Sequence, residues 1–159
     1  MKVCMVPAEP AHFSAVCEIA VKAWAPIYEV YRQKLGDELF EPLFSNWQAQ
    51  KCAGIEAEWN AADAYVALLD GQVVGFIAIH LNETTKNGQI GNNAVDPAFR
   101  GRGIGPQMYE FAMGKMKEAG MAYASVFTGL DEAHAPARKA YEKAGFEKGL
   151  PSIRYYKEL

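Results

Sequence analysis

The sequence predicts an α/β (α+β) fold in which a mixed, mostly antiparallel, twisted sheet of about six to seven strands has helices on both faces. Helical periodicity of apolar residues dominates positions 12–59 and returns at 106–119 and 132–144. Between these stretches, apolar runs separated by turn signals indicate strands. The 159 residues, 50% of them hydrophobic, suffice for the core of one domain spanning residues 1–159.

The N-terminal part is expected to be mostly helical. Residues 3–6 would form a short first strand, because Pro7 and Pro10 lack the N–H that a central strand needs. Pro26 should end the first helix, and Gly36 suggests a kink or a fresh start in the second. The three predicted helices cover residues 12–24, 27–44 and 47–59.

An antiparallel meander is expected in the middle of the chain. Residues 64–69 and 73–81 are apolar runs joined by Asp70-Gly71, a dipeptide that readily adopts the positive φ of a tight hairpin turn. Asn87-Gly88 repeats this signal before a third strand at residues 89–95. The meander therefore ends at a glycine-rich segment.

Helices and strands alternate in the C-terminal part. The apolar spacing after Pro106 is helical, and Gly120 stands where a left-handed C-cap is expected. The predicted elements are a helix at 106–119, a strand at 121–128, a helix at 132–144 and a final strand at 152–157.

Composition excludes several classes of protein. A formal net charge of −3 argues against a nucleic-acid partner, which usually selects a basic surface. The three cysteines are odd in number and show no CxxC pattern, so neither a disulfide framework nor a zinc site is expected. No apolar run approaches the ~18 residues of a membrane span or forms a signal segment. We expect a cytoplasmic protein without a membrane partner.

Residues 95–105, VDPAFRGRGIG, are a candidate anion site. A glycine-rich backbone just before a helix leaves several N–H groups pointing at one spot, where the helix dipole favours a phosphate or pyrophosphate. A plain strand-to-helix turn is the alternative. The pattern of a P-loop is absent, and a dinucleotide fingerprint would need a third glycine where Met108 stands.

Two sequence blocks carry a family resemblance. Arg100, Gly103 and Gly105 match a phosphate-binding signature of Gln or Arg, two residues, Gly, one residue, then Gly or Ala. Downstream, HAPARKAYEKAGF matches the pattern AxxxYxKxGF at Ala137, Tyr141, Lys143, Gly145 and Phe146. From about residue 64 onward the sequence resembles the GNAT superfamily of acetyl-CoA-dependent N-acetyltransferases.

The resemblance implies a GNAT-like sheet and the transfer of an acetyl group from acetyl-CoA, a co-substrate, to a primary amine of a small molecule or peptide, without a metal. It implies that Tyr141 is the general acid that protonates the departing thiolate, a role that suits a phenol. The coenzyme-binding positions that it implies are Asn93, Ala94, Val95, Arg100, Gly101, Arg102, Gly103, Ile104, Gly105 and His134.

Within this set, the backbone of residues 93–95 would pair with the pantetheine arm as an added strand does. His134 stands where relatives commonly have Asn. Its ring would bond the same pantetheine region, or else it is a solvent-facing residue at a helix start.

The acceptor side is less defined by the sequence. No glutamate occurs in residues 89–95, so the base that takes the amine's proton is not identified; the candidates by location are His80, Glu83, Asp131, Glu132 or an ordered water. An aromatic wall with one cation is expected from Trp24, Pro26, Tyr28, Tyr31, Arg32, Tyr155 and Tyr156.

Two further alternatives stay open at this stage. A non-catalytic acyl-CoA-binding or interaction module on the same scaffold would also keep the glycine segment. Transfer of a longer acyl chain, or transfer to a protein N-terminus, is not separated from acetylation of a small amine. A homodimer is expected from the habits of the family alone.

Overall fold

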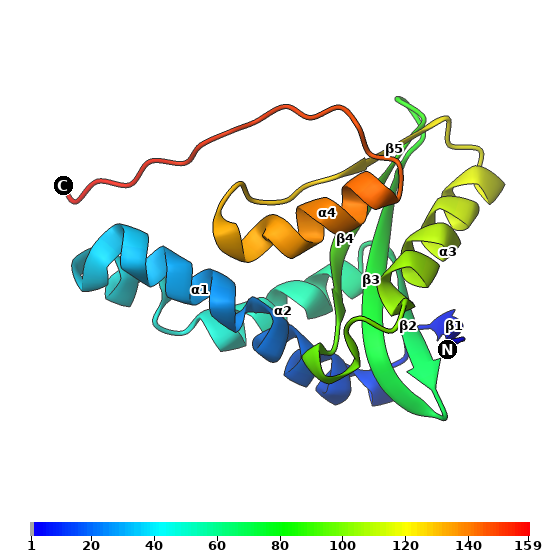
Figure 1. Cartoon of the computed structure of the whole chain (residues 1–159), viewed down its shortest axis with the longest axis horizontal. Coiled ribbons are helices and arrows are strands. Elements are labelled where there is room, and N and C mark those ends of the chain that lie inside the picture. Colours follow the sequence, from blue (N-terminus) through cyan, green and yellow to red (C-terminus); the bar gives the residue numbers. More distant parts are fainter. Residues whose placement is uncertain (1) are drawn as a thin grey trace.

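The computed structural model describes residues 2–159, and these residues have the predicted α+β fold (Figure 1). One sheet has the strand order β1-β2-β3-β4-β5; its first three pairings are antiparallel, whereas β4 and β5 pair in parallel. The described residues form five strands where about six to seven are expected. These strands are β1 (Cys4–Pro7), β2 (Asp63–Leu69), β3 (Gln72–Asn82), β4 (Asn87–Val95) and β5 (Tyr123–Val126).

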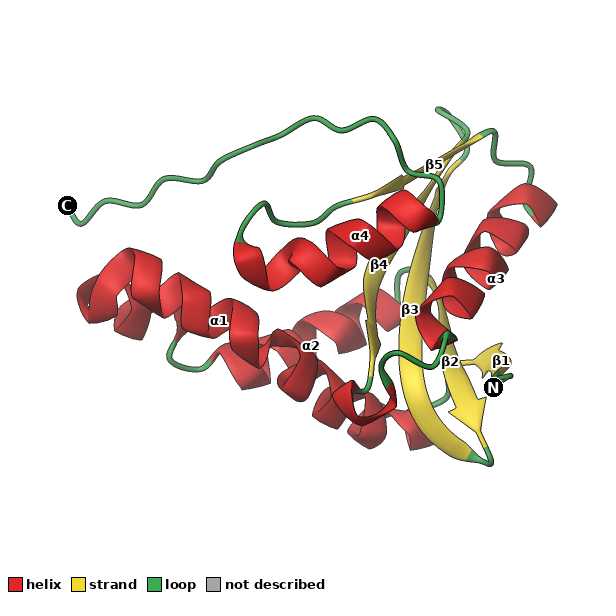
Figure 2. Ribbon diagram, in the orientation of Figure 1, coloured by secondary structure: helices red, strands yellow, loops and turns green. Residues whose placement is uncertain are grey.

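Helices cover both faces of the sheet (Figure 2). On one face the first two α-helices bury Val16 and Ile55 against Phe76, and on the other face the last two bury Met108 and Tyr141 against sheet residues. Since both faces are covered, β3 is buried without interruption over residues 74–79. The helices are η1 (Pro10–His12), α1 (Phe13–Phe44), α2 (Trp47–Trp59), η2 (Pro97–Phe99), α3 (Ile104–Glu118), η3 (Glu132–His134) and α4 (Ala135–Lys143).

The predicted helix end at Pro26 is wrong, because α1 runs through it to Phe44. Proline removes only the hydrogen bond to the carbonyl of Lys22, and both residues lie on the exposed side of α1, where water solvates that carbonyl. The break occurs instead at Gly36, whose φ of 72° and ψ of 162° leave the helical region. The suspected kink there is confirmed.

One of the two predicted hairpin turns is confirmed. Asp70 and Gly71 both have positive φ, 51° and 80°, as a tight primed turn between β2 and β3 requires. The second turn lies earlier than predicted: Asn87 and Gly88 already belong to β4, and Lys86 carries the positive φ. Gly88 is instead buried beneath Met116 of α3, where a Cβ atom would lie 2.5 Å from the methionine side chain.

The expected final strand at residues 152–157 does not form. Its β-branched and aromatic residues favour a strand only when a neighbouring strand is in reach. The segment after α4 instead extends toward α1 (Figure 1), where Tyr156 meets the edge of Phe44 with ring centroids 6.0 Å apart. Strand β5 is also shorter than the predicted 121–128.

The described part of the chain has no helix with both the length and the apolar character that a membrane span requires.

We predict that Phe76→Ala destabilises the fold by about 3–5 kcal/mol, because it removes a fully buried ring from the core beneath α1. Urea unfolding measures this change. Leu81→Ala on the same strand is the matched control: its side chain is 37% exposed, and the expected change is within about 0.5 kcal/mol. Equal losses in the two variants would contradict the assignment of Phe76 to the core.

Candidate active site

Strand β4 has an open edge along its C-terminal half. It pairs with β5 only from Asn87 to Ile90, while its other edge remains paired with β3 as far as Val95. Within residues 2–159, no strand therefore covers the β5 side of residues 91–95. These residues include Asn93, Ala94 and Val95, whose backbone groups the sequence predicts to pair with an extended ligand.

A β-bulge lies at the start of this open edge. Two residues of β4, Gly91 and Asn92, stand opposite the single residue Ala78 of β3, between the pairs Ile77–Asn93 and Ile79–Ile90. A bulge re-aims the side chains around it. Here it sends the side chain of Asn92 to the α2 face of the sheet and that of Asn93 to the α4 face.

The glycine segment connects β4 to α3 as predicted. Asp96 is buried and accepts a hydrogen bond from Ala98 N at 2.9 Å, which starts the short η2 helix. Gly101 and Gly103 follow with φ of 74° and 76°. Gly103 is the N-cap of α3, and no side chain caps that helix end. Since α3 begins at Ile104 rather than at Pro106, the N–H groups of Ile104 and Gly105 belong to its uncapped first turn.

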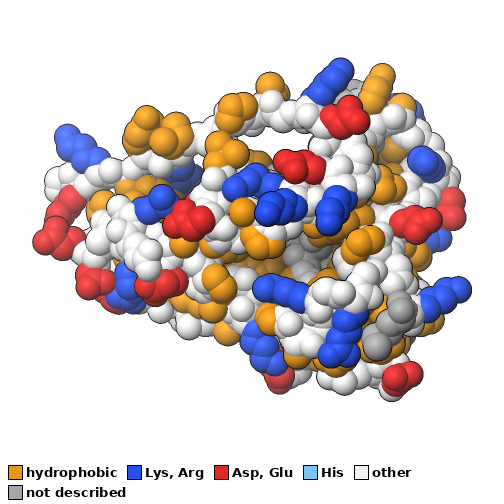
Figure 3. Space-filling model, in the orientation of Figure 1, with side chains coloured by type: hydrophobic (Ala, Val, Ile, Leu, Met, Phe, Trp, Pro, Cys, Tyr) orange, Lys and Arg blue, Asp and Glu red, His pale blue; other side chains and the backbone are white. Residues whose placement is uncertain are grey.

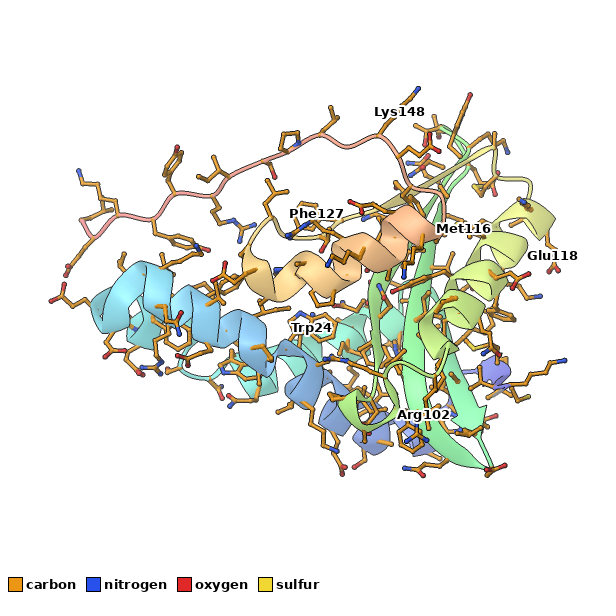
Figure 4. The ribbon with its side chains drawn as sticks, viewed as in Figure 1. Trp24, Arg102, Met116, Glu118, Phe127 and Lys148 are labelled. Atoms are coloured by element: carbon orange, nitrogen blue, oxygen red, sulfur yellow. The ribbon has the colours of Figure 1, made fainter. Side chains whose placement is uncertain are left out.

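The two arginines of this segment, Arg100 and Arg102, are both exposed. The guanidinium of Arg102 donates to Ala98 O at 3.3 Å and lies 5.0 Å from the ring centre of Phe99. Figure 3 shows Lys and Arg side chains on both sides of a hollow between α4 and the segment before α3, and Figure 4 marks Arg102 at its lower rim. An anion in this region would meet positive charge and free helix amides together.

Tyr141 and Asn93, forty-eight positions apart in the sequence, are brought into contact. The amide Nδ2 of Asn93 donates to Tyr141 Oη at 3.0 Å. A second phenol, Tyr109 of α3, donates to Asn93 Oδ1 at 3.2 Å, and the two tyrosine rings lie 5.2 Å apart. Sequence reasoning missed Tyr109, whose helical spacing alone marks it as a core residue.

Burial controls the acidity of both phenols. Tyr141 and Tyr109 are each 7% exposed. Desolvation raises the pKa of Tyr141 above its ordinary value, although the hydrogen bonds from Asn93 and Tyr109 oppose that rise. Burial also raises the pKa of Tyr109, as does the neighbouring Tyr141. Tyr141 therefore stays protonated through neutral pH, the state that a proton donor needs.

His134 is held by a carboxylate at the start of α4. Asp131 accepts from His134 Nδ1 at 2.7 Å and from the backbone N–H groups of Ala133 and His134. Arg138 donates to the carbonyls of Gly129 and Asp131 at 2.7 Å each and so fixes the same turn. Because the Nδ1 proton is committed to Asp131, Nε2 is the atom of His134 left to bind a ligand.

The structure separates the four candidate bases. Glu83 pairs with Lys86 at 2.6 Å in the exposed turn before β4, and Glu132 is exposed. Asp131 is committed to its turn, as described above. Only His80 joins a cluster beside the β4 bulge, where its Nε2 lies 2.7 Å from Glu58 of α2. The sequence analysis did not single out Glu58.

The expected aromatic wall is mostly internal packing. Tyr28 stacks on Trp47 with centroids 4.3 Å apart, and Tyr31 packs beside Phe44. The cation of the wall, Arg32, is already paired with Asp37 and Glu41 at 2.6 and 2.7 Å. Tyr155 is exposed, and Tyr156 meets Phe44. Trp24 is the member that reaches the sheet near β4 (Figure 4).

A protein-family model identifies the family of this chain. The model of the acetyltransferase (GNAT) family matches residues 24–146, which is most of the chain. The protein therefore belongs to the GNAT family, and the two sequence blocks that suggested the resemblance lie within the matched range.

Single proteins that the chain resembles agree with this family, and the chain spans about 30% of the length of the first curated relatives that it matches. The chain is 36% identical over 95 residues to N-acetylaspartate synthetase of Rattus norvegicus; the match covers 57% of this chain and 30% of that protein. The chain also resembles the PaiA N-acetyltransferase of Thermoplasma acidophilum, which was solved in complex with coenzyme A, with a TM-score of 0.74 and 17% sequence identity. The superposition covers 92% of this chain and 91% of the PaiA chain. AAC(6')-Iy with a bisubstrate analogue has a TM-score of 0.69 at 16% identity over 100% of both chains. The two structures share the fold.

We predict a pH-dependent contribution of Asp131 to stability. Burial raises its pKa, but the hydrogen bonds and charge of His134, with two backbone amides, outweigh burial and hold the pKa below the ordinary value of 3.8. A depressed carboxyl pKa stabilises the fold above the unfolded-state pKa, and this stabilisation is lost as the pH falls through the folded-state pKa. Asp131→Asn should therefore be less stable than the wild type near neutrality.

Urea unfolding across the pH range measures this difference. The gap between the two proteins should stay constant down to about pH 4 and narrow below it. A gap that persists unchanged into stronger acid would show that the ionised form of Asp131 has no favoured partner in the fold.

Proposed function

We propose that this protein transfers the acetyl group of acetyl-CoA to a primary amine of a small molecule or peptide, by direct attack of the amine within a ternary complex. One observation carries the proposal: the buried hydroxyl of Tyr141 is held by Asn93 at the open edge of β4, next to an uncapped helix start. A proton donor, an unpaired strand edge and an anion-suited loop thus lie together.

The residues fit the parts of coenzyme A. The N–H groups of Ile104 and Gly105, beside Arg100 and Arg102, suit a pyrophosphate. The side chain of Ile104 is buried in the core, so only its backbone serves this purpose. The open edge at residues 93–95 offers backbone groups to an extended amide-containing arm. His134 Nε2 is the side-chain atom proposed to bond that arm.

The chain's residues then support acyl transfer. The lone pair of the neutral amine forms the new N–C bond at the acetyl carbonyl carbon, and the C–S bond breaks as the tetrahedral intermediate collapses. Tyr141 gives its phenolic proton to the departing thiolate sulfur; the nitrogen loses a proton to solvent as the amide forms, and the phenolate of Tyr141 regains one from solvent. A backbone N–H on the open edge of β4 stabilises the carbonyl oxygen as it gains charge.

The acceptors named for related proteins are diverse. Five of the curated relatives carry the name N-acetylaspartate synthetase, one structural neighbour is titled with an acetylneamine analogue, and another with the alanine of a ribosomal protein. Because these acceptors share only an amine, the acceptor of this chain is decided by its own residues on the α1–α2 side of β4.

We predict that Tyr141→Phe lowers kcat by about 10²–10⁴-fold and leaves the affinity for coenzyme A nearly unchanged, because the ring remains and only the donated proton is lost. Release of free thiol from acetyl-CoA across a panel of primary amines measures turnover. Tyr109→Phe is the comparison, since it removes a phenol from the same cluster without removing the proposed acid, and it should lose less than about tenfold.

Two outcomes would contradict this assignment. Full activity of Tyr141→Phe would exclude Tyr141 as the acid. Tight coenzyme binding by the wild type without turnover on any amine would favour a non-catalytic acyl-CoA-binding module over the proposed reaction.

We predict that Gly103→Val abolishes coenzyme A binding and leaves the fold intact. Valine resists the φ of 76° that Gly103 adopts, at a cost of about 1–3 kcal/mol, and relieving this strain would move the first amides of α3. Gly120→Val is the matched control, because Gly120 has a φ of 77° with open space around it at the far end of the same helix. Calorimetric titration with coenzyme A compares the two; equal affinities would contradict the loop assignment.

A further inference from the structure

A chain of polar side chains lies on the α2 face of the sheet, at the β4 bulge. Lys51, Ile55 and Glu58 follow one another at four- and three-residue spacing, so they share the side of α2 that packs on the sheet. Ile55 is fully buried in the core between them. Lys51 and Glu58 meet the two ends of the same amide, that of Asn92: the lysine donates to Oδ1, and Glu58 accepts from Nδ2 at 2.8 Å.

Lys51 is a half-buried cation without an anionic partner. Its ammonium lies 3.7 Å from the ring centre of Trp24, and none of residues 2–159 forms an ion pair with it. Burial lowers its pKa to about 8, although the charge of Glu58 opposes this shift. The direct contacts of this desolvated ammonium are an amide and an aromatic ring, neither of which carries a negative charge. An anion bound from solution would therefore stabilise it.

Glu58 and His80 form the other end of this chain. The carboxylate of Glu58 is 12% exposed and accepts from His80 Nε2 at 2.7 Å, from the bulged Asn92 N at 3.2 Å and from Asn92 Nδ2. Because Glu58 holds the proton on Nε2, the lone pair of His80 is on Nδ1, and in the described chain that atom makes no hydrogen bond. The side chain of His80 is 40% exposed, so an acceptor amine has access to it.

This cluster adjoins the reacting centre from the opposite face. Asn92 belongs to it, whereas the next residue, Asn93, holds Tyr141. The bulge therefore places the cluster and the proposed acid on either side of one strand, at the point where β4 loses its β5 neighbour. An amine that approaches from the α1–α2 side reaches the donor site without passing Tyr141.

We propose that Lys51, Glu58 and His80 form the acceptor site, and that it takes the zwitterion of an α-amino acid. Lys51 binds the carboxylate of the amino acid, and the ammonium of the amino acid lies toward the Glu58–His80 pair. The charges match the ligand: a separated cation and carboxylate on the protein meet a carboxylate and an ammonium on the acceptor. The inference rests on the proposed function and assigns the acceptor of that same reaction.

His80 supplies the missing base. Its Nδ1 takes one proton from the bound ammonium, which leaves a neutral amine with a free lone pair for attack on the acetyl carbon. The imidazolium is stabilised by Glu58 and later returns its proton to solvent. Glu58 is a positioning residue in this scheme, since it acts through the histidine. Overall, one ammonium and one thioester are converted into one amide, one thiol and one proton that is released to solvent.

The first experiment compares matched acceptors with the full chain and saturating acetyl-CoA. Thiol release is measured for common L-amino acids and for their α-carboxamides, which keep the amine and the side chain but lack the carboxylate. Wild type should prefer the free acids. Lys51→Met, which keeps the length of the side chain over Trp24, should raise KM for the acids about 10–100-fold and leave the carboxamides unchanged.

Lys34→Met, a substitution on the exposed part of α1, is the control and should behave as the wild type. Turnover of amines without any preference for the free acids, or an equal effect of Lys51→Met on both series, overturns this inference and leaves the proposed function standing. Coenzyme binding without turnover on any amine overturns the proposed function itself.

The second experiment tests the base. His80→Gln should lower kcat about 10²-fold at neutral pH and leave both KM for the amino acids and the affinity for coenzyme A nearly unchanged. The carboxylate that faces His80 is Glu58 of α2, so Glu58→Gln should also lower kcat with little change in KM, whereas Lys51→Met changes KM. The control is His12→Gln, which replaces a histidine whose Nδ1 accepts a hydrogen bond from the backbone N–H of Glu9. An unaltered kcat in His80→Gln excludes this residue as the base.

Discussion

Strand β4 has two neighbours along its first half and one along its second, and the rest of the site depends on this change. Strand β5 ends at Val126, so the backbone of residues 91–95 keeps hydrogen-bonding capacity on one side. Backbone groups that no neighbouring strand covers need another partner. The glycine segment and α3 follow directly from the same open stretch, which brings an unpaired strand edge and a helix start into one place.

The bulge at Gly91 and Asn92 adds a second consequence. Consecutive asparagines point to opposite faces of the sheet, as in any strand, and the extra residue in β4 decides that Asn92 is the one that faces α2. Asn93 joins the phenols of Tyr109 and Tyr141 on the α3–α4 face, and Asn92 joins Lys51 and Glu58 on the α1–α2 face. The bulge leaves Asn92 without a partner residue in β3, and its backbone N–H donates to the carboxylate of Glu58.

The two faces divide the chemistry that we propose. The α3–α4 face holds the donor side, with a buried acid and uncapped helix amides, and the α1–α2 face holds charged groups suited to an acceptor. The phenols of Tyr109 and Tyr141 and the carboxylate of Glu58 are largely buried, so their hydrogen bonds are stronger than they would be in water.

The fold class and the Asp70-Gly71 hairpin were predictable from the sequence because they depend on local periodicity and backbone freedom. The glycine segment and Tyr141 stay predictions of the site, made from contiguous motifs. The sequence did not determine whether α1 continues through Pro26, or that residues 152–157 find no strand to pair with, since both depend on what lies nearby in space. Only the tertiary structure brought Lys51, Glu58 and His80 to the β4 bulge. These residues come from α2 and β3, and a polar residue on a packed helix face gives no sign in the sequence of which partner it meets.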